Sequence, residues 1–229
     1  IQEHFNDLVI GTYGRGIWIL DDISPLQQLN QDVTKKSAYL FDLKSSYRFQ
    51  NVTSTLQMFP EASSGQDPPK GASINYWLNE DKDVELFITN SSNDTVKTIA
   101  DKGKKGINRV WWDFMGEKSN PMIMRTKPQY AEWFSIGDER IRNIPSNISI
   151  MQPPGTYRVH LESDGTTYSK ELIVVKDPHS EGTLEDIKLQ NDLMNKIYND
   201  LNTTAMYVNS IESIRRQLID LKSALSGNG

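Results

Sequence analysis

Seven short apolar segments separated by turn signals restrict this chain to a mainly β architecture. They lie at 38–43, 73–78, 84–89, 95–100, 108–114, 155–161 and 168–175. In the last two, apolar and polar residues alternate, which is typical of strands with one buried face. Asp164-Gly165 between these two segments is a signal for a two-residue hairpin turn. About seven strands at this spacing predict an antiparallel β-sandwich, interrupted by long loops at 51–70 and 115–154.

Residues 1–30 contain a separate β-hairpin signal. Two apolar, β-branched runs at 7–12 and 17–20 flank a turn that contains Gly14 and Gly16. A two-stranded hairpin is marginally stable in water, so we expect this one to require a sheet from elsewhere. The chain starts at Ile1 and not at a methionine, and we therefore expect it to be part of a longer or processed protein.

Residues 183–226 have a helical pattern. Thr183 to Asp186 resembles a capping box, and apolar residues then recur three or four positions apart from Leu193 to Leu225. One long helix and a helical hairpin broken near 202–204 both fit this pattern. Because the period wanders between three and four, we expect the apolar stripe to dock on the sandwich or on a second helix, in preference to a coiled-coil dimer.

Composition and charge exclude several classes of function. The net charge is −5 and the pI about 5.3, with no basic face of the kind that nucleic-acid binding needs. The absence of cysteine excludes disulfides, thiolate nucleophiles and Cys-based zinc sites. No apolar run approaches the ~20 residues that a membrane-spanning helix requires, so we expect no membrane span.

The segment NDLVIGTYGRGIWILDDISPL at 6–26 resembles the closing segment of a family of bacterial β-propellers. These are the glycosyl-hydrolase-like proteins with BNR (Asp-box) repeats, also called sortilin-like propellers. Downstream, 38–41, 71–77 and 106–113 also resemble the C-terminal region of that family. The stretches 106–113 and 154–159 are in addition similar to the Ig-like domain of flagellar hook-capping proteins. An Asp-box proper, Ser-x-Asp-x-Gly-x-Thr-Trp, is absent from the sequence.

The resemblance implies a three-part architecture that is mainly β. Residues 1–30 would form the last propeller-blade hairpin and a linker, 31–180 an Ig-like β-sandwich, and 181–229 a C-terminal helical segment. The implied function is a non-catalytic structural and interaction module of a larger secreted protein, whose main partner is the preceding propeller. Such a protein would be exported, to the periplasm, the cell surface or the medium.

Candidate catalytic carboxylates do not form a convincing pair in this sequence. Glycoside hydrolysis needs two carboxyl groups about 5–10 Å apart across a cleft. Asp21 and Asp22 are neighbours on a predicted strand, so their side chains point to opposite faces. Asp138 and Glu139 lie in a long loop beside two arginines and suit a surface charge cluster. We therefore expect no catalytic residues, and the chain alone is not expected to be an enzyme.

Metal and cofactor sites are not indicated either. The three histidines, His4, His160 and His179, lie far apart in the sequence and in different parts of it. Arg15, at the hairpin turn, is interpreted as a tie between the hairpin and its neighbour. We expect no metal and no cofactor.

Aromatic residues supply the alternative function, a carbohydrate- or peptide-binding module accessory to a glycoside hydrolase. On a strand, one of Trp111 and Trp112 must face inward and the other outward. The outward ring would stack on a sugar or pack against another domain, and we favour packing. The candidate ligand-binding residues are Trp112 and, from the 115–154 loop, Tyr130 and Trp133.

Overall fold

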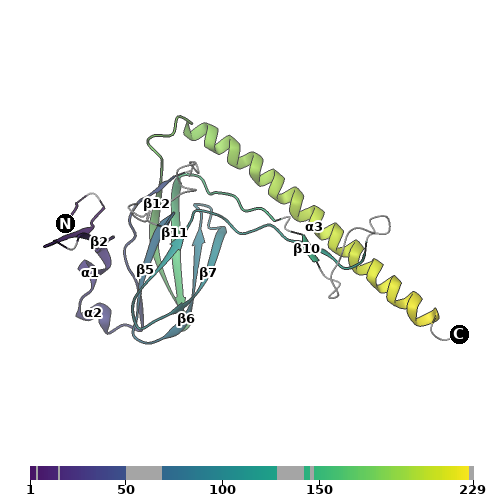
Figure 1. Ribbon diagram of the computed structural model, residues 1–229, viewed down its shortest axis with the longest axis horizontal. Coiled ribbons are helices and arrows are strands. Elements are labelled where there is room, and N and C mark those ends of the chain that lie inside the picture. The colour runs from purple at the N-terminus through teal and green to yellow at the C-terminus, as the bar shows by residue number, and fades with distance from the viewer. Residues whose placement is uncertain (4, 15, 50–68, 128–141, 145–146, 227–229) are drawn as a thin grey trace. The chain divides into compact units, whose positions relative to one another are not determined.

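The computed structural model describes residues 1–3, 5–14, 16–49, 69–127, 142–144 and 147–226 (Figure 1). Strand makes up 40% of the structure, one sheet is curled into a half-barrel, and the chain ends in a long helix. The predicted mainly β class with a C-terminal helical segment is therefore confirmed. By their contacts the residues form two compact units, 1–114 with 153–184, and 115–152 with 185–229. This grouping differs from the expected boundaries at 30 and 180, because 115–152 belongs with the helix.

The first unit contains a five-stranded sheet in the order β4-β12-β11-β6-β7. Its strands are β4 (Ser46–Arg48), β6 (Lys82–Thr89), β7 (Thr95–Gly103), β11 (Gly155–Ser163) and β12 (Thr166–Lys176). Neighbours pair antiparallel except β4, which pairs parallel to β12. The predicted turn at Asp164-Gly165 joins β11 to β12, and both turn residues have positive φ.

A three-stranded antiparallel sheet, in the order β3-β5-β8, completes the core of this unit. It comprises β3 (Ala38–Leu40), β5 (Ala72–Leu78) and β8 (Gly106–Trp112). All seven strands predicted from the sequence are thus present. β4 was not predicted.

The core of the first unit draws on both sheets. Along β5, β6, β11 and β12, alternate side chains are apolar and point into the core. Their burial stabilises the fold by roughly 25 cal/mol per Å² of apolar surface removed from water. The Trp112 ring of β8 meets the Tyr157 ring of β11 edge to face at a centroid distance of 5.1 Å. The Tyr76 hydroxyl of β5 donates to Asp101 of β7, and burial, with a further contribution from this hydrogen bond, raises the pKa of the phenol. The fully buried side chains of this core include Leu40, Ile74, Leu78, Leu86, Ile88, Leu161 and Leu172.

An N-terminal extension precedes these sheets. It consists of the predicted hairpin, β1 (Leu8–Thr12) and β2 (Gly16–Leu20), followed by the short helices α1 (Ser24–Gln28) and α2 (Gln31–Thr34). Pro25 near the start of α1 suits the first turn of a helix, where its missing N–H costs nothing. The Asn30 side chain caps α2 by accepting from the amides of Asp32 and Val33.

The second unit is built on α3 (Leu184–Ser226), one unbroken helix. This settles the choice between one helix and a hairpin that the sequence left open. The helix begins directly after Thr183, where the capping signal lies. A second short hairpin, β9 (Met122–Met124) with β10 (Arg142–Ile144), belongs to the same unit. None of the helices in the described ranges is long and apolar enough to cross a membrane.

Residues 115–126 bind along α3 through polar side chains of the helix. Asn202 accepts from the amide of Asn120 at 2.7 Å, and Asn209 accepts from the amide of Ile123 at 2.7 Å. One turn further along, Glu212 accepts from the amides of Arg125 and Thr126. These acceptors lie on one face of the helix. They accept hydrogen bonds from backbone amides of the extended segment, which in a sheet would be bonded to a neighbouring strand.

Candidate functional site at the N-terminal hairpin

The β1–β2 hairpin exposes apolar side chains on both of its faces. Cross-strand pairs are Leu8 with Leu20, Val9 with Ile19 and Ile10 with Trp18. Since successive side chains on a strand alternate, Leu8 and Ile10 share one face and Val9 lies on the other. Among the most exposed are Ile17 at 73% and Trp18 at 66%. An apolar surface of this extent on both faces is typical of strands that are covered on both sides in a larger assembly.

Two glycines with positive φ flank the tip of the hairpin turn. Gly14 and Gly16 have φ values of 74° and 95°, a region that glycine adopts without strain. The Thr12 hydroxyl donates to the carbonyl of Gly16 at 2.8 Å and closes the turn. Arg15, which was expected to tie the hairpin to a neighbour, lies outside the described residues.

The base of the hairpin is held by contacts between the residues that flank its strands. The amide of Asp22 donates to the Asp7 carboxylate at 2.9 Å, and the amide of Ile23 donates to the carbonyl of Asn6 at 3.0 Å. The Asn6 side chain donates to the Ser24 hydroxyl at 2.9 Å. These contacts fix the chain where it enters β1 and where it leaves β2, so the apolar strands project from an ordered base.

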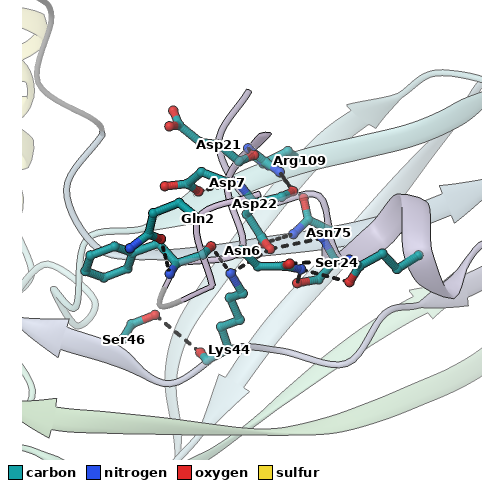
Figure 2. A network of polar contacts seen from close by, with 12 residues as sticks. Gln2, Asn6, Asp7, Asp21, Asp22, Ser24, Lys44, Ser46, Asn75 and Arg109 are labelled. Atoms are coloured by element: carbon teal, nitrogen blue, oxygen red, sulfur yellow. Dashed lines mark hydrogen bonds and ion pairs between the residues drawn. The ribbon is translucent and has the colours of Figure 1, made fainter. Parts of the chain in front are cut away.

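Asp22, Asn75 and Arg109 join this base to the three-stranded sheet (Figure 2). The side-chain amide of Asn75 on β5 donates to the Asp22 carboxylate at 3.4 Å, and the Oδ1 atom of the same side chain accepts from Nε of Arg109 at 2.7 Å. The two terminal nitrogens of Arg109, on β8, donate to the carbonyls of Asp21 and Asp22 at 3.1 and 2.9 Å. Asn75 is only 3% exposed although it lies on the outer face of its strand, because this N-terminal segment covers it.

Lys44 adds a cation to the same cluster. Its ammonium group lies 3.1 Å from the Asp22 carboxylate and also contacts the carbonyl of Phe5 (Figure 2). Burial raises the pKa of Asp22, but hydrogen bonds from Ser24 and Lys44 and the charge of Lys44 outweigh it and hold that pKa below its ordinary value. Asp22 is therefore ionised at neutral pH and fully engaged in binding its neighbours.

This arrangement suits a structural clamp better than a catalytic centre. The Asp22 carboxylate is occupied by Lys44, by the Asn75 amide and by the backbone amide of Ser24. Asp21 takes part through its backbone carbonyl, and Asp7 accepts the amide of Asp22. These contacts hold the base of the apolar hairpin against the three-stranded sheet.

The structure places Trp112, a candidate ligand-binding residue, in the core. It is 1% exposed and packs edge to face against Phe114 as well as Tyr157, which leaves no ring face open to a sugar. Trp111, its neighbour on β8, is partly exposed. Tyr130 and Trp133, together with Asp138 and Glu139, lie outside the described residues.

His160 on β11 lies close to a serine and a threonine hydroxyl group. Its ring stacks on Phe87 at 4.4 Å, with the Ser169 hydroxyl 2.8 Å from Nδ1 and the Thr89 hydroxyl 3.2 Å from Nε2. Burial, with a contribution from Arg158, lowers the pKa of the imidazole. Both ring nitrogens thus contact hydroxyl groups, so no carboxylate orients the ring as in a catalytic triad.

Among the residues that the structure describes, no three His, Asp or Glu side chains lie together in a group that could hold a metal ion. His179 is exposed after β12, and His4 lies outside the described residues.

Comparison with known proteins adds no assignment: no protein-family model, no curated protein and no solved structure matches this chain.

Proposed function

We propose that this chain is a structural and interaction module whose N-terminal hairpin completes a β-sheet of a larger body, the last blade of a β-propeller. In this proposal the two sheets of the first unit form an Ig-like β-sandwich that supports the hairpin. The chain itself performs no catalysis, and the protein to which it belongs is exported.

The observation that carries the proposal is the doubly exposed apolar hairpin. An isolated hairpin of two five-residue strands, apolar on both faces, is at best marginally stable in water. Its outer edges also offer free N–H and C=O groups, which pair with further strands when a sheet is extended. The Asp22–Asn75–Arg109 cluster supports the proposal in turn, because a docking element is effective when it is pre-ordered.

The first test is the size of the native polypeptide that carries this sequence. An antibody raised against the 26.1 kDa chain should detect a much larger protein in cells that produce it. A native product of about the same mass as this chain would contradict the proposal.

The second test addresses the hairpin itself. The segment encoded upstream is produced separately and mixed with this chain, and binding is measured by calorimetry. Replacing Trp18 with lysine should abolish binding, because it places a charge in an apolar interface. Ser92→Lys, which adds the same charge at the exposed turn between β6 and β7, should bind as the parent chain does. Equal binding by both variants would refute a role for the hairpin.

A glycan array separates this proposal from a carbohydrate-binding module. Because Trp112 is buried, sugar recognition would depend on Tyr130 and Trp133. Saturable binding that is lost in Trp133→Ala would favour recognition, and no binding by the folded chain would favour the structural module.

A further inference from the structure

Helix α3 carries an apolar stripe on a face distinct from the polar one that binds 115–126. Alternately four and three positions separate its members, which are Tyr207, Ile211, Ile214, Leu218, Leu221 and Leu225. All six side chains are more than half exposed. Strict alternation of four and three gives a period of 3.5, which matches the seam of a left-handed coiled coil.

The stripe lies on the far side of the helix from the bound segment. At about 100° per residue, its mean direction is roughly 180° from that of Asn202, Ala205, Asn209 and Glu212, which face 115–126. Among the residues that the structure describes, Ile214 borders a cavity that Ile123 and Arg125 of the segment also line, but it remains 56% exposed, and the segment leaves the stripe open.

We propose that the Tyr207–Leu225 stripe pairs with the same stripe of a second copy of this chain, in a parallel two-helix coiled coil. Ile211, Leu218 and Leu225 occupy the a positions, while Tyr207, Ile214 and Leu221 occupy the d positions. With six half-exposed or more exposed apolar side chains in each copy, we expect an interface at the lower end of the size range for specific interfaces.

The width of the stripe favours a helix as the partner. A helix that docks on a sheet or a globular surface presents an apolar face at least about 100° wide, with a third apolar position in each heptad. Here the flanking positions from Ser210 onward are mostly polar. They are Ser210, Arg215, Gln217, Lys222 and Ala224.

Charge at the flanking positions favours a parallel pair of identical chains. The e positions hold Arg215, which pairs with Glu212 of its own helix, and the cation Lys222, whereas the g positions hold the uncharged Ser210, Gln217 and Ala224. Parallel pairing sets each e residue beside a g residue of the partner, so each cation meets a neutral polar group. An antiparallel pair would bring e against e and place cations near one another.

The seam is bounded on its N-terminal side. Continued upstream, the same pattern puts Thr204 at an a position and Asp200 at a d position, where a carboxylate would be buried without a partner. The paired region therefore spans about three heptads, and we expect a reversible, concentration-dependent dimer.

Sedimentation velocity of the full chain over a wide concentration range tests the proposal. The mass should rise from 26.1 kDa to twice that value with concentration. Ile214→Glu and Leu218→Glu should each remain monomeric throughout. Ser223→Glu, which adds the same charge at an f position of the helix, should dimerise as the parent chain does, and so should the hairpin variant Trp18→Ser.

Orientation is tested with Leu225→Cys, because the chain has no other cysteine. Mild oxidation should link two parallel copies, whereas antiparallel copies would hold these positions about 27 Å apart. A monomer at every concentration, a trimer, or a dimer that persists in both Ile214→Glu and Leu218→Glu would overturn the proposal. Helical circular dichroism of each variant confirms that α3 is intact.

Discussion

Glu212 accepts the backbone amide of Thr126 at 2.8 Å and the hydroxyl of the same residue at 2.9 Å, although the two residues lie far apart in the sequence. The same carboxylate accepts the amide of Arg125 at 2.8 Å and pairs with Arg215 at 2.6 Å. With 3% of its surface exposed, Glu212 is a buried anion that is satisfied on every side. It is the principal polar attachment between α3 and the extended segment.

Replacing Glu212 with alanine should therefore release this segment. The change leaves the amides of Arg125 and Thr126 without an acceptor, and we expect it to destabilise the attachment by about 3 kcal/mol. Hydrogen exchange followed by mass spectrometry should show faster exchange at 120–126. Asp192→Ala, which removes an exposed carboxylate from the same helix, should leave exchange there unchanged. Equal protection in both variants would contradict the role given to Glu212.

Acid should loosen the same attachment in the parent chain. Burial raises the pKa of Glu212, but hydrogen bonds from Arg125 and Thr126 and the charge of Arg215 outweigh it, so the pKa lies below its ordinary value of 4.5. A lowered pKa in the folded state stabilises the fold above the ordinary value, and this stability is lost as the pH falls from 4.5 through the folded pKa. Exchange at 125–126, corrected for the intrinsic effect of pH, should accelerate over that interval. It should not do so in Glu212→Gln, in which the group cannot titrate.

Gly71 marks a close approach between backbone segments in the first unit. A Cβ at this position would lie 1.9 Å from the carbonyl oxygen of Trp112, and φ is 108°. Gly106 has the same φ but nothing within 4 Å of the corresponding position. Gly71→Ala should therefore cost about 2 kcal/mol more than Gly106→Ala, because both changes strain φ and only the first creates a clash. Urea unfolding measures the difference, and equal midpoints would show that the backbone adjusts freely.

The regular strands were predictable because their signals are local. β11 and β12 alternate cleanly, and Asp164-Gly165 specifies the turn between them. β4, β9 and β10 are three residues each and have no alternation to detect. β4 in particular is a strand because β12 lies beside it, a relationship that no short window of sequence contains.

The site residues were less predictable, because their roles depend on burial and on distant partners. Trp112 was a reasonable ligand candidate, yet it fills the core between two sheets. Asn75 occupies an outward position that a polar residue suits in any sheet, and its burial follows from the N-terminal segment that covers it. The heptad pattern of α3 is regular only from Tyr207 onward. When the whole helix is considered together, the polar residues Asp200 and Thr204 at the preceding d and a positions interrupt the pattern.

Asn75 provides the last prediction, because it links the hairpin base to β8 through both ends of its amide. Asn75→Ala leaves Arg109 without its side-chain acceptor and removes one donor from Asp22, so we expect a loss of about 2 kcal/mol in the free energy of unfolding. The loss should be concentrated at the hairpin base, with faster hydrogen exchange at Asp22 and Ile23 than in the parent chain. Ser73→Ala, on the same face of β5 but partly exposed, should change stability by no more than about 0.5 kcal/mol. If Asn75→Ala left exchange at the base unchanged, the contacts that Asn6, Asp7, Lys44 and Arg109 make would suffice to hold the hairpin, and the Asn75 amide would be dispensable.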